Sequence, residues 1–214
     1  MPTPESRVAF VSGGRLPGWV ERFAASHGPA AAEIHDGGLR LAADDGAVAV
    51  LQAPWPVDGR PGSGPDAVTR LASLASQSRT LGLVLIRRGG YSVAVVGGGA
   101  VLASKTGTRH VQSRTAAGGW SQQRFARRRA NQADALVEAV AEHAARIFAD
   151  HRVEYLAGGG DRTLAEQVLA EPVLKRYAAL ARLPFLDVPD PRAAVLKRAA
   201  ADLCSVRILV TDAP

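Results

Sequence analysis

The chain has 214 residues, enough for one domain or for a core domain with a smaller companion. A chain of this length buries roughly three quarters of its unfolded surface, and its single cysteine, Cys204, excludes an intramolecular disulfide framework. Cys204 lies in an apolar run, which predicts a buried thiol. The N-terminus lacks the basic-then-apolar order of a secretion signal, and no apolar run approaches the roughly 18 residues of a spanning helix. We therefore expect a soluble, cytoplasmic protein with no membrane partner.

Positive charge is concentrated in one central region of the chain. No Asp or Glu occurs from Ala67 to Ala133, and that span contains 11 basic residues, whereas the rest of the chain has 15 basic residues against all 20 acids. The net charge of +6 and the pI near 10.2 are weaker signals than this segregation. Because a one-sided Lys/Arg surface binds phosphate backbones through counterion release, the segregation predicts a nucleic-acid partner.

Hydrophobic periodicity divides the first part of the chain into short strands and one helix. The pattern predicts a strand over Arg7 to Ser12, a helix over Pro17 to Ser26, and short strands between Ala31 and Gln52 joined by Asp-Gly turns. The stretch from Ala53 to Pro65 is rich in Pro and Gly, so we place a domain boundary there. Residues 1–65 are expected to form a small N-terminal α/β extension, with Trp55 tucked onto its core.

Residues 66–214 are expected to form the second, larger domain. A helix capped by Asp66 runs to about Gln77, and three strands with short turns follow as an antiparallel meander over residues 81–86, 91–96 and 100–103. A basic loop, residues 104–121, comes next. We expect this loop to be mobile because like charges and glycines disfavour a packed conformation. An unusually long amphipathic helix then runs from about Gln122 to Phe148.

Strands and helices alternate in the last third of the chain. The pattern predicts a strand over Val153 to Ala157, a structural glycine turn at 158–160, and helices over Thr163 to Leu169 and Val173 to Leu183. A further helix begins after Asp190-Pro191, and a strand over Val206 to Val210 closes the chain. This order predicts an α/β (α+β) fold, a mixed β-sheet flanked by helices.

The stretch from Thr108 to Asn131 carries the chemistry of the chain. It contains a glycine pair suited to close approach to a ligand, Gly118-Gly119. The amides of Gln122 and Gln123 donate and accept hydrogen bonds but cannot act as acid or base near pH 7. Trp120 is able to stack on a nucleobase. Three arginines at helical spacing share one face and can follow a phosphate backbone: Arg124, Arg127 and Arg128.

This stretch resembles the loop and helix start of the eukaryotic and archaeal class I peptide release factors. In those proteins a Gly-Gly-Gln tip precedes an Arg-Phe-x-Arg helix start, which Gly118-Gly119 and Arg124-Phe125-Ala126-Arg127 match in part. The similarity extends over about Leu81 to Leu169, and none is visible in the first 65 residues. The resemblance implies the RNase H-like architecture of the release-factor central domain.

The sequence departs from that family at the tip, because Trp120 stands where a release factor has its Gln. The stretch Gly119-Trp120-Ser121-Gln122 has instead the Gly-x-x-Gln spacing of the Vms-like release factors of ribosome-associated quality control. The chain resembles the short actinobacterial version of that family. The resemblance implies a peptidyl-tRNA hydrolase, a carboxylic ester hydrolase that releases nascent peptides from tRNA on stalled large ribosomal subunits. The implied partners are rRNA and peptidyl-tRNA, without DNA, metal or cofactor, and we expect a monomer.

The resemblance also assigns roles to single residues. Gln122 would position the hydrolytic water, Gly118 and Gly119 would let the loop enter the peptidyl transferase centre, and Gln123 is the second candidate for the catalytic amide. Because an aminoacyl ester is already reactive, an amide and backbone N–H groups suffice as catalytic groups. The expected RNA-binding residues are Lys105, Arg109, Arg114, Trp120, Arg124, Arg127, Arg128 and Arg129.

Two other functions compete with hydrolysis. A non-catalytic ribosome- or tRNA-binding module of the same fold would explain the basic loop without using the amides. An RNase H-type nuclease would need clustered acids on adjacent strands, and Leu81 to Ala103 has none. His143 and His151 have no Cys or second His at ligand spacing, which argues against a zinc site.

Overall fold

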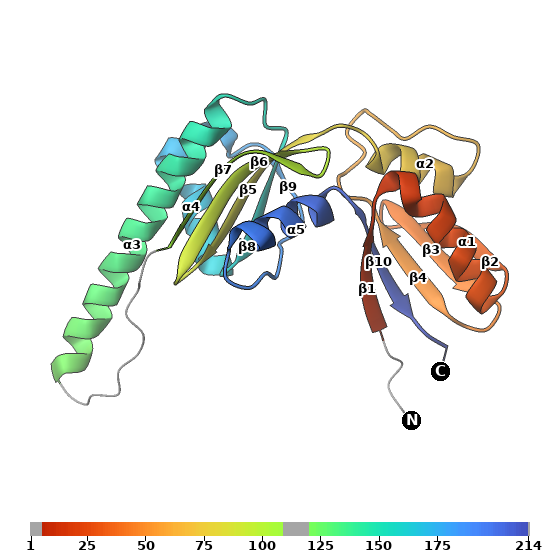
Figure 1. Cartoon of the computed structure of the whole chain (residues 1–214), viewed down its shortest axis with the longest axis horizontal. Coiled ribbons are helices and arrows are strands. Elements are labelled where there is room, and N and C mark those ends of the chain that lie inside the picture. The colour runs from red at the N-terminus through yellow and green to blue at the C-terminus, as the bar shows by residue number, and fades with distance from the viewer. Residues whose placement is uncertain (1–5, 109–119, 214) are drawn as a thin grey trace. The chain divides into compact units, whose positions relative to one another are not determined.

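The computed structural model describes residues 6–108 and 120–213, and for residues 120–131 it describes the backbone alone. The chain divides into two compact units (Figure 1). The first consists of Met1–Ser78 together with Ala201–Pro214, and the second of Arg79–Ala200. Each unit contains a five-stranded sheet flanked by helices, which confirms the predicted α/β (α+β) class. Among the described residues, no helix has the length and apolar character needed to cross a bilayer.

The sheet of the first unit is antiparallel, with the strand order β1-β10-β4-β3-β2. Its strands are β1 (Ser6–Val11), β2 (Ala30–His35), β3 (Gly38–Ala43), β4 (Val48–Gln52) and β10 (Val206–Thr211). The turn between β2 and β3 has positive φ angles of 46° at Asp36 and 72° at Gly37, as expected for the predicted Asp-Gly hairpin. A short 3-10 turn, η1 (Gly13–Arg15), and the helices α1 (Leu16–His27) and α2 (Ala67–Ala75) complete the unit.

The stretch predicted to be a linker is packed onto α2. Trp55 is 3% exposed, as predicted, and its indole Nε1 donates a hydrogen bond to the carbonyl of Leu74 at 3.0 Å. Further along, the Gln77 side-chain amide donates to the carbonyl of Arg60 at 2.9 Å. These bonds keep residues 53–65 with the first unit, so the division falls after Ser78 and not near residue 65.

The helix α2 also belongs to the first unit. Asp66 caps it by accepting the backbone N–H of Thr69 at 2.8 Å, as the sequence predicted. Leu71, Ala72 and Ala75 join the same core cluster as the β10 residues Val206 and Ile208. The last strand therefore completes the first sheet, pairing with β1 and β4, although it follows the second unit in sequence.

The sheet of the second unit is mixed, with the order β7-β6-β5-β8-β9. The strands β5 (Thr80–Arg87), β6 (Gly90–Gly97) and β7 (Ala100–Thr108) form the predicted antiparallel meander, and β7 includes residues expected in the basic loop. The strand β8 (Tyr155–Gly160) runs parallel to β5, and the short β9 (Ala181–Arg182) runs parallel to β8. The mixed sheet was predicted, whereas the RNase H-like assignment stays a prediction.

Helices cover this second sheet. The long helix α3 (Trp120–Ala149), α4 (Arg162–Ala170) and a 3-10 segment η2 (Pro172–Tyr177) contribute to its hydrophobic core. The segment before α5 (Ala193–Leu203) contacts β6, where the buried Ser92 hydroxyl donates to the carbonyl of Pro191 at 3.0 Å. Cys204, just beyond α5, is buried as predicted.

Two predicted elements differ from the structure. The helix expected over residues 173–183 is wrong: only η2 is helical there, and β9 follows. Pro184 explains part of this, because a residue before proline is disfavoured in the helical region. The glycine turn expected at 158–160 is also wrong, since these residues form the end of β8. Leu186 pairs with this strand: its N–H donates to the carbonyl of Gly158 at 2.9 Å, and its own carbonyl accepts from Gly160 at 3.0 Å.

We predict that Gly159→Ala destabilises the second unit by about 1–3 kcal/mol, because a Cβ there would lie 2.7 Å from Leu85 Cδ2 and 2.9 Å from the Leu186 carbonyl oxygen. Gly89→Ala is the matched control, since a Cβ at Gly89 meets nothing within 4 Å and should change stability by less than about 0.5 kcal/mol. Urea denaturation measures both free energies of unfolding. Equal effects would contradict the packing role of Gly159.

Candidate functional site

The predicted site residues fall into three groups in the structure. Arg109, Arg114, Gly118 and Gly119 lie outside the described residues. A second group lies in the first three turns of α3, where the backbone alone is described: Trp120, Gln122, Gln123, Arg124, Arg127, Arg128 and Arg129. Lys105 is the one predicted RNA-binding residue with described side-chain surroundings, and it lies exposed on β7 opposite Val93 of β6.

The helix α3 is much longer than the sheet contact that holds it. Its 30 residues span about 45 Å at a rise of 1.5 Å per residue. The buried α3 residues found in the described region begin at Leu136 and continue through Val140, Ala144 and Phe148. Figure 1 shows the N-terminal part of α3 extending beyond the sheet. Gln122 therefore lies about 20 Å along the helix from Leu136, the first buried residue among those whose side chains are described.

The two candidate amides lie in the first turn of α3. The first four backbone N–H groups of a helix have no intrahelical partner, and these groups belong here to residues 120–123. The helix dipole adds partial positive charge at the same end, and the first turn contains no acidic residue. The backbone at this end of α3 is therefore suited to stabilise a negatively charged oxygen.

A ring stack joins the base of α3 to the sheet. The rings of His143 on α3 and Tyr91 on β6 are stacked, with centroids 5.6 Å apart and planes 18° apart. Tyr91 in turn lies against Gly107 of β7, where a Cβ would come within 2.6 Å of the phenol ring. Glycine at this position lets the stack sit close to the strand that leads toward the predicted loop.

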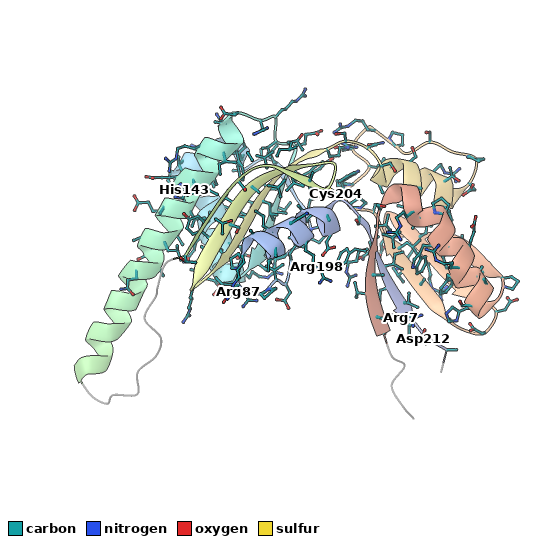
Figure 2. The ribbon with its side chains drawn as sticks, viewed as in Figure 1. Arg7, Arg87, His143, Arg198, Cys204 and Asp212 are labelled. Atoms are coloured by element: carbon teal, nitrogen blue, oxygen red, sulfur yellow. The ribbon has the colours of Figure 1, made fainter. Side chains whose placement is uncertain are left out.

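The electrostatic surroundings of His143 are positive. Partial burial is the main cause that lowers the pKa of His143 from its ordinary value, and the charges of Arg146 and Lys105 lower it further, against an opposing effect of Glu142. The Arg146 guanidinium lies 2.7 Å from His143 Nδ1, an arrangement in which Arg donates to a neutral imidazole. Sequence reasoning considered His143 only as a metal ligand, because the contact with Tyr91 spans 52 positions. Figure 2 places His143 on α3.

Charge is divided unequally between the two units. The second unit carries 19 basic and 10 acidic residues, which give +9, whereas the first carries 7 basic and 10 acidic residues, which give −3. The site residues on α3 and β7 all belong to the positive unit. Within the described part of the chain, no group of three or more His, Cys, Asp or Glu residues is placed to hold a metal ion.

A protein-family comparison matches residues 79–209 to the actinobacteria/chloroflexi VLRF1 release factor family. The chain belongs to this VLRF1 release factor family. The match covers more than half of the chain and begins at the first residue of the second unit. Membership of the VLRF1 family gives the chain a role in translation, in release or quality control at the ribosome.

Comparison with solved structures finds a likeness to a Vms1 mitochondrial localization core, at 13% sequence identity and a TM-score of 0.41. The likeness covers 92% of this chain and 84% of the Vms1 chain. No curated protein shows a significant match to the sequence. The family match to VLRF1 is therefore the comparison on which the assignment depends.

We predict that an NMR titration will find the His143 pKa below its ordinary value of 6.5. Arg146→Gln should raise this pKa, because it removes the nearest positive charge, and Lys105→Gln should raise it as well. Glu142→Gln should lower it further, because a neighbouring negative charge is lost. A pKa that stays the same in all three variants would contradict the charged surroundings of the ring.

Proposed function

We propose that this chain is a peptidyl-tRNA hydrolase that releases nascent peptides from tRNA on stalled large ribosomal subunits. The second unit is the catalytic domain, and its Gly-x-x-Gln segment, Gly119 to Gln122, positions the attacking water. The protein works in the cytoplasm as a monomer with rRNA and peptidyl-tRNA as partners. No metal or cofactor takes part in this proposal.

The first turn of α3 is the observation that carries the proposal. It combines two glutamines, backbone N–H groups that have no intrahelical partner, and the positive helix end in a member of a release-factor family. The length of the helix supports delivery of this end into a deep site, since about 20 Å of helix separates Gln122 from Leu136, the first α3 residue described as buried on the sheet. A single projecting helix can reach the ester of peptidyl-tRNA, which lies deep in the large ribosomal subunit.

The reaction is the addition of one water across an ester. The water oxygen bonds to the carbonyl carbon, the bond from that carbon to the tRNA ribose oxygen breaks, and a proton ends on the ribose oxygen. A glutamine side chain holds the water as a hydrogen-bond acceptor and donor but does not take up its proton. Positioned amide and N–H donors lower the barrier by stabilising the oxyanion as it develops.

Helical periodicity places both candidate amides on the side of α3 that continues its buried face, and the Gly-x-x-Gln spacing selects position 122. Gln122 and Val140 are 18 residues apart, about five turns, so position 122 continues the line of the helix that faces the sheet. Gln123 and the fully buried Ala141 are also 18 residues apart, so position 123 continues the same buried side. Arg124, Arg127 and Arg128 fall on the opposite side, which supports separate helix faces for the ester and for RNA phosphates.

We predict that Gln122→Ala lowers the rate of peptide release by at least about 100-fold, the usual cost of removing a group that supports the transition state. The assay uses purified large subunits that carry labelled peptidyl-tRNA, and co-sedimentation should show unchanged subunit binding. Gln123→Ala is the matched control and should keep most of the rate. Loss in Gln123→Ala alone would transfer the role to Gln123. Binding without release by the wild type would instead establish the non-catalytic module.

We predict that Lys105→Gln weakens binding to large subunits and reduces by about 1 the slope of log affinity against log salt, as expected for the loss of one phosphate contact. Arg40→Gln, on β3 of the acidic first unit, removes the same charge and should leave the slope unchanged. Affinities measured over a series of salt concentrations test both variants. Equal effects would show that net charge, and not the β7 position, governs binding.

A further inference from the structure

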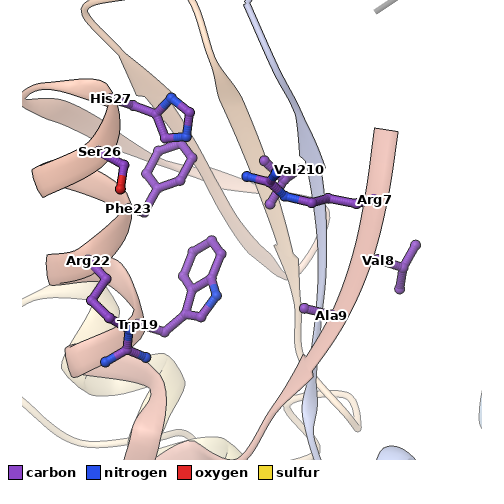
Figure 3. A pocket seen from close by; sticks show the side chains of 9 residues that line it. All are labelled: Arg7, Val8, Ala9, Trp19, Arg22, Phe23, Ser26, His27 and Val210. Atoms are coloured by element: carbon purple, nitrogen blue, oxygen red, sulfur yellow. The ribbon is translucent and has the colours of Figure 1, made fainter. Parts of the chain in front are cut away.

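The first unit has a pocket between the helix α1 and the edge strand β1. Its volume is about 190 Å³, and the two elements that form it are joined in sequence by the short turn η1. Figure 3 shows Trp19 and Phe23 reaching from α1 toward the strand, with Ala9 and Val210 on the sheet side. Pockets for drug-sized ligands measure about 300–1,000 Å³, so this pocket suits one bulky side chain of a larger partner.

The aromatic wall of the pocket is held in place by its own contacts. The rings of Trp19 and Phe23 are stacked with centroids 5.5 Å apart, and the Phe23 and His27 centroids are 4.8 Å apart. The His27 Nδ1 atom forms a 2.8 Å hydrogen bond with Asp45 Oδ2, which fixes the orientation of that ring. Because these side chains are already ordered, binding of an apolar group here does not cost their conformational entropy.

The strand beside the pocket lies at the edge of its sheet. β1 pairs with β10 on one side and is the first strand in the sheet order. Proteins usually protect such edges with charges, prolines or bulges. Arg7 is the one charged residue of β1, and Val8, Phe10 and Val11 leave the rest of the strand apolar. Val8 and Phe10 are 48% and 39% exposed. Val8 is one of the residues that line the pocket, and Figure 3 shows its side chain on the side of β1 away from α1. An added strand would thus meet apolar side chains on both faces of β1.

The charges near the pocket identify the chemistry of the occupant. The first unit has a net charge of −3, which disfavours an RNA backbone as the ligand. At the pocket itself two arginines line the opening, Arg7 from β1 and Arg22 from α1. Arg7 is paired with Asp212 at 3.3 Å, whereas Arg22 forms no ion pair within the described part of the chain. Arg22 is therefore placed to bind a carboxylate next to an apolar side chain.

We propose that the first unit docks an extended peptide segment of a partner protein. The peptide adds as a strand along β1, inserts one bulky apolar side chain between Trp19 and Ala9, and sets a neighbouring carboxylate against Arg22. Main-chain hydrogen bonds to the edge provide affinity, and the pocket provides specificity. This docking surface would supply a protein contact that is separate from the RNA contacts of the second unit.

A second copy of the chain fits the same surface poorly. If two β1 strands paired, each would present Arg7, Ala9 and Val11 on the pocket side of the sheet, because these residues alternate with Val8 and Phe10. None of the three is a bulky apolar or aromatic group that would fill a pocket of about 190 Å³. A foreign peptide with a Phe, Leu or Trp at the matching position fills it.

The experiment pans a phage library of random dodecapeptides against the full chain and measures dissociation constants of the enriched synthetic peptides by fluorescence anisotropy. We expect a shared motif of one bulky apolar residue beside Asp or Glu. Three variants should each weaken binding by about tenfold or more: Ala9→Leu, which fills the pocket, Val8→Lys, which charges the edge, and Arg22→Glu, which removes the carboxylate partner.

Two matched controls make the same chemical changes elsewhere in the first unit. Ile34→Lys charges the other edge strand, where Ile34 is 82% exposed, and Arg15→Glu reverses an exposed charge that does not line the pocket. Both should bind the peptide within about twofold of the wild type, and thermal melting should show that every variant is folded. The proposal is overturned if no motif is enriched, if the controls lose as much affinity, if a poly(U) RNA competes for the pocket, or if Val8→Lys dissociates a dimer.

Discussion

The packing of the C-terminal half of α3 on the mixed sheet sets the direction of the whole helix. Leu136, Val140 and Phe148 are buried in the same cluster as Val84 and Val93 of the strands. Each fully buried side chain of this kind contributes about 1.5–3 kcal/mol. Ala141 and Ala144 are fully buried between them and keep the helix close to the strands. A helix held so firmly at one end can extend its other end without losing its direction.

The end of this contact is as closely packed as its centre. Phe148 meets Gly82 of β5, where a Cβ would come within 2.9 Å of the Phe148 ring, and its ring meets Tyr177 edge-on at 88°. Five residues earlier on the helix, the stack of His143 on Tyr91 couples α3 to β6. The neutral imidazole accepts from Arg146, so a region rich in cations avoids one further positive charge. His143 thus contributes both to the packing of α3 on the sheet and to the limited positive charge of this region.

The division of charge between the units separates two kinds of recognition. A second unit with a charge of +9 suits a ribosomal RNA environment, whereas a first unit at −3 needs another source of affinity. An edge strand, an aromatic pocket and an arginine at its opening offer that source without a phosphate backbone. Under the proposals made above, the chain brings together a unit that acts on RNA-bound peptide and a unit that docks a partner protein.

The sequence by itself determined the long helix, the antiparallel meander, the buried Cys204 and the family, because periodicity and short motifs are local properties. It also located the amides of Gln122 and Gln123 at a helix start. Tertiary structure decided the rest. The first unit extends to Ser78 and not to residue 65, because hydrogen bonds of Trp55 and Gln77 hold residues 53–65 against α2. The strand β10 belongs to the first sheet because it pairs with β1 and β4, which lie about 150 or more residues earlier in the chain. Gly158 to Gly160 resemble a turn in sequence, yet Leu186 pairs with them as part of a strand, a contact that no local pattern encodes.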